Sequence, residues 1–134
     1  MLYKLTALLL IGLTLAGCSE PPYTNINNAQ LKTMMEQGIV VYDIRRVDEW
    51  RQTGTIKNSQ RLTFVDATGR MQTNFLPQFT QSIEKNQPVI LICRTGNRSG
   101  VLARHLMEQM GYTQVYNVRD GITRWISDGN PITR

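Results

Sequence analysis

The strongest constraint on the fold comes from residues 89–110, where an apolar run, a short polar loop and an amphipathic segment follow one another directly. Val89–Ile92 is continuous and rich in branched side chains, as a buried strand is. The segment from Gly100 to Met110 has the spacing of a helix that buries one face, formed by Ala103, Leu106, Met107 and Met110. The sequence therefore predicts a strand that leads through a tight loop into a helix.

The rest of the chain repeats this alternation. Helical patterns are predicted from Asn28 to Gly38 and over 47–51, 74–83 and 121–126, and strands over 39–42, 61–65 and 115–118. Alternating helices and strands predict an α/β fold in which helices flank a mostly parallel central sheet of about five strands. A chain of 134 residues with a normal apolar share suggests one such domain.

The loop at 93–99 carries the chemistry, and its sequence is Cys-Arg-Thr-Gly-Asn-Arg-Ser. Cys93 stands at the carboxyl end of a strand, and the loop runs into a helix N-terminus, where backbone N–H groups are unpaired and the dipole is positive. A cysteine is nucleophilic as a thiolate, which these amides, together with Arg94 and Arg98, would stabilise. We therefore expect a reactive thiolate, or an anion bound beside it. The alternative is an inert cysteine buried at a strand end.

Other cysteine chemistries fit the sequence less well. The only histidine, His105, lies about 9 Å along the predicted helix from Ser99, which argues against a Cys–His dyad. One histidine and one available thiol argue against a zinc site, and no other metal or cofactor is indicated. The chain has no Cys-x-x-Cys pair for thioredoxin-type exchange.

A second polar cluster follows the strand at 39–42, where Asp43 and Arg45 occupy the strand exit. Sites in open parallel sheets are built at the carboxyl ends of strands, so both residues are candidates for the same site as Cys93. A turn or capping role for Asp43 is an equally open alternative.

The N-terminus has the pattern of a targeting segment. Lys4 precedes an apolar stretch over 5–15 that is short for a membrane span, and Leu-Ala-Gly then leads to Cys18. This pattern resembles a bacterial lipoprotein signal, which implies removal of residues 1–17 and lipid, palmitate included, on Cys18. Ser19 resembles the sorting signal for the periplasmic face of the outer membrane. We expect a tether over 18–27 and a folded domain over 28–134.

The formal net charge of +5 comes from scattered basic residues without an aromatic stacking motif. It favours small anions or anionic surfaces over nucleic acid as partners. If Cys18 carries lipid, Cys93 has no partner for a disulfide within the chain.

From about Asn28 to Ile132 the chain resembles a single-domain rhodanese, a sulfurtransferase. The loop at 93–99 resembles the active-site loop of that family closely. Three weaker pieces occur in the family's order: residues 43–50, the helix and turn from Ala103 to Tyr112, and a C-terminal set of Gly121, Trp125, Gly129 and Pro131. The chain departs from the family at Thr55 and Asn58, where a histidine and a glycine are frequent, and at Asp120, where a glycine is frequent.

The resemblance implies that Cys93 takes sulfane sulfur from an anionic donor such as thiosulfate and passes it to cyanide or a thiol. It also implies that the persulfide is surrounded by the amides of Arg94, Thr95, Gly96, Asn97, Arg98 and Ser99. Arg94 and Arg98 would attract the anionic donor. Arg98 could instead pair with Asp43 or Glu49, and Ser99 could cap the helix.

Related phosphatases and arsenate reductases have a Cys-x5-Arg loop that wraps an oxyanion, whereas here Arg98 follows Cys93 after four residues. The shorter loop favours sulfur transfer. A persulfide carrier and a rhodanese-like interaction module without activity stay open as alternatives.

Overall fold

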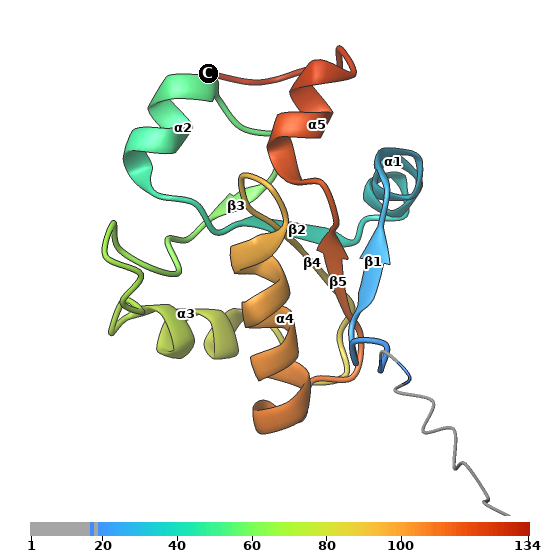
Figure 1. The fold of residues 1–134 in the computed structure, drawn as a ribbon, viewed down its shortest axis with the longest axis vertical. Coiled ribbons are helices and arrows are strands. Elements are labelled where there is room, and N and C mark those ends of the chain that lie inside the picture. Colours follow the sequence, from blue (N-terminus) through green and yellow to red (C-terminus); the bar gives the residue numbers. More distant parts are fainter. Residues whose placement is uncertain (1–16, 18) are drawn as a thin grey trace, which may run out of the picture.

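The computed structural model describes residue 17 and residues 19–134. Ten elements alternate along these described residues in the order β1 (Thr24–Ile26), α1 (Asn28–Glu36), β2 (Val40–Asp43), α2 (Val47–Thr53), β3 (Gln60–Arg61), α3 (Phe75–Ser82), β4 (Val89–Ile92), α4 (Asn97–Met110), β5 (Val115–Val118) and α5 (Gly121–Ser127) (Figure 1). Residues 1–16 and Cys18, which carry the predicted signal and lipid site, lie outside the described residues, so that prediction stays untested. Across the described part of the chain, no helix has both the length and the apolar character to cross a membrane.

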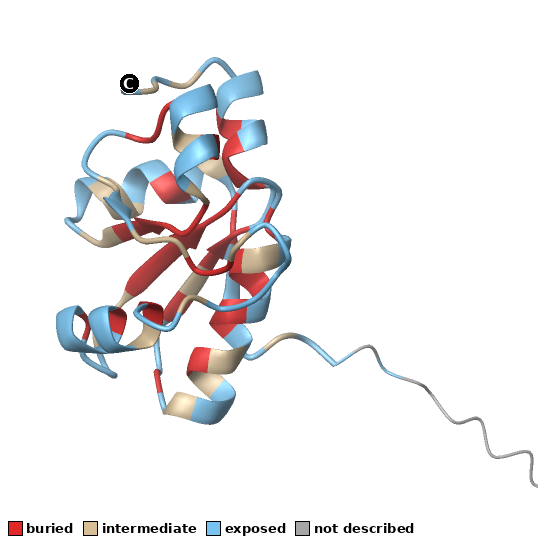
Figure 2. Ribbon diagram, turned by 90° about the vertical axis from the view of Figure 1, so that its left-hand side faces the viewer, coloured by how far each residue is buried: buried red, intermediate tan, exposed pale blue. Residues whose placement is uncertain are grey.

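The five strands form one sheet in the order β1-β5-β4-β2-β3, and every pairing is parallel. This confirms the predicted α/β fold. The central strand β4 is buried along its whole length, because it has a paired strand on each side and helices over both faces (Figure 2). A strand in that position has no solvent-facing side, which explains its uninterrupted apolar sequence.

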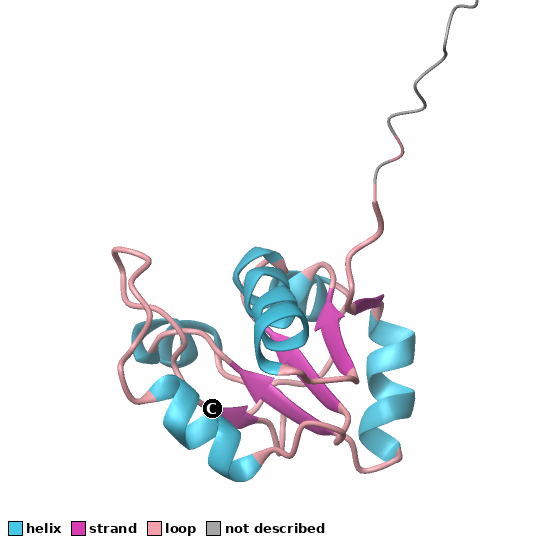
Figure 3. Ribbon diagram, turned by 90° about the horizontal axis from the view of Figure 1, so that it is seen from below, coloured by secondary structure: helices cyan, strands magenta, loops and turns pink. Residues whose placement is uncertain are grey.

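Helices cover both faces of the sheet, and each face has its own apolar core (Figure 3). Leu91 points to the side where Phe79 of α3 and Leu106 of α4 pack. Its neighbours Ile90 and Ile92 point to the other side of the sheet. There they pack in the same core as Leu31 of α1 and Trp125 of α5. The alternation of side chains along a strand therefore builds the two cores from consecutive residues.

The structure corrects two predicted segments. Residues 24–26, predicted to belong to the tether, form the edge strand β1, which pairs with β5 from Thr24 opposite Tyr116 to Ile26 opposite Val118. The strand predicted over 61–65 is shorter, because only Gln60 and Arg61 pair regularly with β2. Beyond them the chain stays beside the exit of β2 through single bonds from Leu62 to Asp43 and from Phe64 to Ile44.

The helix predicted from Gly100 begins three residues earlier, at Asn97. The second half of the polar loop is therefore the first turn of α4. The carboxyl ends of β2, β4 and β5 lie at one edge of the sheet, because all three strands run in the same direction. Cys93 follows β4 at this edge.

Candidate active site

Two residues of the loop that follows Cys93 place three hydrogen-bond donor groups around its sulfur. The backbone N–H of Gly96 lies 3.2 Å from Sγ, the backbone N–H of Ser99 3.5 Å, and the Ser99 hydroxyl oxygen 3.2 Å. Cys93 is only 1% exposed, so these donors replace water around the sulfur. The positive end of the α4 dipole adds to them, since this helix begins at Asn97. The arrangement stabilises negative charge on the sulfur.

The helix α5 fixes the opposite side of the loop. The backbone N–H of Ile122 donates to the carbonyl oxygen of Cys93 at 2.9 Å, and that of Thr123 donates to the carbonyl oxygen of Arg94 at 3.1 Å. These donors belong to the first turn of α5, where a helix has N–H groups to spare. The first two carbonyls of the loop thus face α5, while the amides of Gly96 and Ser99 face the sulfur.

Gly96 allows this path because its φ is +94°, a value that side-chain-bearing residues rarely adopt. A Cβ at this position would lie 1.9 Å from the carbonyl oxygen of Arg119, which follows β5. The loop is therefore pressed against the β5–α5 connection. Sequence reasoning singled out this glycine as part of the loop, and the contact gives the reason for it.

Arg98 points to Glu49 of α2 and forms a two-pronged ion pair with it, with nitrogen–oxygen distances of 2.7 and 2.8 Å. Glu49 also accepts a bond from the backbone N–H of Arg46 at 3.0 Å, which caps α2. Burial raises the pKa of Glu49, but the bonds from Arg98 and Arg46 and their positive charges outweigh it and bring that pKa down to about 2. The pair with Glu49 raises the pKa of Arg98 in turn.

This pair makes stability depend on pH. The folded-state pKa of Glu49, about 2, lies below its ordinary value of 4.5, so the stabilisation is complete above about pH 4.5 and is lost as the pH falls toward 2. We expect Glu49→Gln to lower the free energy of unfolding by about 2 kcal/mol at neutral pH, a value reduced for solvent screening, and to remove this part of the acid dependence. Denaturant unfolding at a series of pH values measures both.

The matched control is Glu108→Gln, which breaks the exposed pair with Arg104 on the surface of α4. Exposed pairs of this kind contribute about 0.5 kcal/mol or less. An equal loss of stability in the two variants would show that Glu49 gains nothing from its partly buried position.

Asp43 and Arg45, predicted to contact the substrate, are 0% and 1% exposed and bind each other, with a nitrogen–oxygen distance of 2.8 Å. Nη1 of Arg45 donates to the hydroxyl of Thr53, and Nη2, which also bonds Asp43, donates to the carbonyl oxygen of Gly54 at the end of α2. Both side chains are thus engaged within the protein. For Asp43 this geometry favours the turn role considered from the sequence, because its side chain also accepts a bond from the backbone N–H of Arg45. Arg45, for which no such alternative was considered, has a structural role at the exit of β2 as well.

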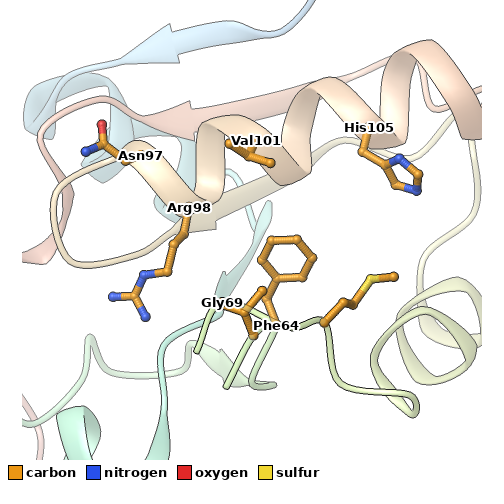
Figure 4. A pocket seen from close by; sticks show the side chains of 8 residues that line it. Phe64, Gly69, Asn97, Arg98, Val101 and His105 are labelled. Atoms are coloured by element: carbon orange, nitrogen blue, oxygen red, sulfur yellow. The ribbon is translucent and has the colours of Figure 1, made fainter. Parts of the chain in front are cut away.

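The other predicted site residues lie at the surface of the loop. Arg94, Thr95 and Asn97 are exposed, and Arg94 forms no ion pair with any residue between 19 and 134. His105 does not accompany them, because it lies farther along α4 and faces, with Val101, a groove of about 450 Å³ lined mainly by apolar groups (Figure 4). Arg98 and Asn97 form the end of that groove nearest the loop.

The family model described as the rhodanese-like domain matches residues 27–128. The chain belongs to the rhodanese family.

Relatives of this rhodanese-like chain include sulfurtransferases. It is 32% identical over 96 residues to a sulfurtransferase of Allochromatium vinosum, a match that covers 72% of this chain and 79% of the relative. It is 44% identical over 50 residues to the thiosulfate sulfurtransferase GlpE of Tolumonas auensis, where the match covers 37% of this chain and 46% of the relative. The crystal structure of a rhodanese-related protein from Thermoplasma volcanium, 28% identical, superposes with a TM-score of 0.62 over 83% of this chain and 98% of that one.

Two of the departures from the rhodanese pattern lie just after α2 and just before α5. Thr55, in place of a frequent histidine, pairs through its backbone with Thr133 near the end of the chain. Asp120 replaces the first glycine of a frequent pair, while the second, Gly121, is kept. A Cβ at Gly121 would lie 2.2 Å from the carbonyl oxygen of Arg94, so the retained glycine is the one against the active-site loop.

Sequence reasoning missed one residue of this rhodanese site. Asn117 of β5 is 3% exposed, and its side-chain oxygen accepts a hydrogen bond from the hydroxyl of Ser99. The pattern at 115–118 predicts only that this residue belongs to a strand. The signal was available, because an asparagine within the otherwise apolar strand 115–118 must find hydrogen-bond partners when it is buried.

Proposed function

We propose that this protein is a sulfurtransferase that carries sulfane sulfur on Cys93. The observation that supports it most directly is the convergence of three hydrogen-bond donors on one buried sulfur within a rhodanese-like domain. A group of donors fixed in this way stabilises an anion without having to reorganise as charge develops.

The reaction has two halves. The thiolate of Cys93 attacks the sulfane sulfur of a donor such as thiosulfate, a bond forms between the two sulfurs, and the donor's own sulfur–sulfur bond breaks to release sulfite. A thiophile such as cyanide then attacks the terminal sulfur of the persulfide. Thiocyanate leaves and the thiolate returns. The amides of Gly96 and Ser99 and the hydroxyl of Ser99 offset the charge on Cys93 at both stages.

The two arginines of the loop have different roles in this proposal. The charge of Arg98 is largely compensated by Glu49, so Arg98 shapes the loop and contributes less to binding an anion. Arg94 is exposed next to the nucleophile and forms no ion pair in the described range 19–134. We assign to Arg94 the attraction of an anionic sulfur donor.

The same geometry argues against phosphatase chemistry. A phosphate-binding loop needs an arginine that can form two hydrogen bonds with the oxyanion. Here two terminal nitrogens of Arg98 are bound to the carboxylate of Glu49, and the loop is one residue shorter than Cys-x5-Arg.

The proposal is tested with the purified protein, thiosulfate and cyanide. We expect thiocyanate to form, and mass spectrometry after thiosulfate alone to show a gain of one sulfur atom on Cys93. A gain of mass without turnover would indicate a persulfide carrier. If neither thiocyanate nor a gain of mass is observed, the proposal is overturned, and a rhodanese-like interaction module is left.

A further inference from the structure

A buried chain of polar groups connects β5 to the nucleophile. The side-chain nitrogen of Asn117 donates to the carbonyl oxygen of Gly96 at 3.2 Å and to the side-chain oxygen of Asn25 at 2.9 Å. Its side-chain oxygen accepts the hydroxyl of Ser99 at 2.5 Å. The same hydroxyl oxygen lies 3.2 Å from Sγ of Cys93.

The orientation of the Asn117 amide follows from its neighbours. A backbone carbonyl can only accept, so the group of Asn117 that faces the carbonyl of Gly96 must be the NH₂ group. The oxygen of Asn117 then faces Ser99 and can only accept. A serine hydroxyl has a single proton, and here two acceptors, the oxygen of Asn117 and the sulfur of Cys93, lie within reach of it.

We propose that Asn117 is a positioning residue that competes with Cys93 for the proton of the Ser99 hydroxyl. In the resting thiol, the S–H group donates to Ser99 and the Ser99 O–H group donates to Asn117. When the thiol loses its proton to solvent, the Ser99 hydroxyl turns to donate to the sulfur anion and gives up its bond to Asn117. Asn117 therefore favours the protonated thiol and holds the hydroxyl ready for the charge that develops on the sulfur.

This inference deepens the proposed function, since both concern Cys93. It concerns a different question, namely whether Asn117 or Cys93 accepts the proton of the Ser99 hydroxyl. The charged and titratable side chains on the elements around the thiol include Arg98 of α4, Glu49 of α2, Asp43 and Arg45 at the exit of β2, Arg94 in the loop, and Tyr23, whose hydroxyl lies beside Gly100. Removing the amide of Asn117 changes none of these groups.

The test is a pH titration of thiolate ultraviolet absorbance in a Cys18→Ser background, where Cys93 is the only thiol, with the matching Cys93→Ser protein subtracted. We expect Asn117→Leu to lower the midpoint of thiolate formation by about half to one pH unit, because the Ser99 hydroxyl is then free for the sulfur. Leucine has a similar size, and the carbonyl of Gly96 keeps its bond from the backbone N–H of Gly100 at 3.1 Å. Asn117→Val, suited to a strand, is the second variant, with the same expected shift.

Two controls separate this role from a structural one. In a Ser99→Ala background Asn117→Leu should leave the midpoint unchanged, because no hydroxyl remains to be shared. Asn25→Ala removes the exposed end of the chain and should not move the midpoint, since Gly96 still orients Asn117. An unchanged midpoint in both Asn117 variants, a rise, or a shift that persists without Ser99 would overturn the inference. No sulfur donor is used, so the titration and the thiocyanate assay can fail independently.

Discussion

Cys93→Ser is expected to lower thiocyanate formation from thiosulfate and cyanide by on the order of a thousandfold or more. A serine hydroxyl is a far weaker nucleophile than a thiolate and forms no persulfide. Its oxygen can still accept the bonds that Gly96 and Ser99 give to the sulfur, so the loop should keep its shape. Initial rates measure the loss, and thermal unfolding checks that the variant is folded.

The chain itself offers the control for this variant. Cys18→Ser removes the other cysteine and should leave thiocyanate formation by the purified protein at the level of the unchanged chain. If turnover survives in Cys93→Ser and falls in Cys18→Ser, the nucleophile has been assigned to the wrong residue. If both variants turn over normally, the reaction does not pass through a cysteine of this chain.

The sequence was sufficient to predict those parts of the fold in which local pattern and tertiary environment agree. Residues 89–92 are apolar without interruption because β4 is covered on both faces. The burial of this strand can therefore be predicted from its sequence alone. The edge strand β1 gives no such signal. It is three residues long and only Ile26 is buried, so the parallel partner β5, which is remote in the sequence, determines that it is a strand.

The site shows the same division. The position of Cys93 between a strand and a helix could be predicted, because strand, loop and helix are consecutive. The partners of the charged side chains could be predicted only in part, since they depend on which elements the fold brings together. The sequence left Asp43 and Glu49 both open as partners of Arg98, and the structure shows the pair with Glu49. Arg98 reaches a carboxylate 49 residues away, whereas Arg45 pairs with Asp43 only two residues away. Because Arg98 is paired, Arg94 is the exposed arginine of the loop. The sequence motif, which contains both arginines, does not tell their roles apart.

Gly96→Ala is expected to lower the free energy of unfolding by about 3 kcal/mol or more. One part, about 1 kcal/mol, comes from placing a side chain at a φ of +94°. The larger part comes from the new Cβ, which would lie 1.9 Å from the carbonyl oxygen of Arg119, so the loop or the β5–α5 connection must move. Denaturant unfolding measures the sum.

Gly129→Ala separates these two parts. Gly129 has a φ of +78°, and a Cβ there meets nothing within 4 Å, so only the backbone term of about 1 kcal/mol should remain. Movement at Gly96 also displaces an amide that lies 3.2 Å from the sulfur, so Gly96→Ala should lose sulfur transfer per folded molecule while Gly129→Ala keeps it. Equal losses of stability in the two variants would mean that the loop relaxes freely. The amides around Cys93 would then owe their positions to the loop alone, and not to the contact with β5 and α5.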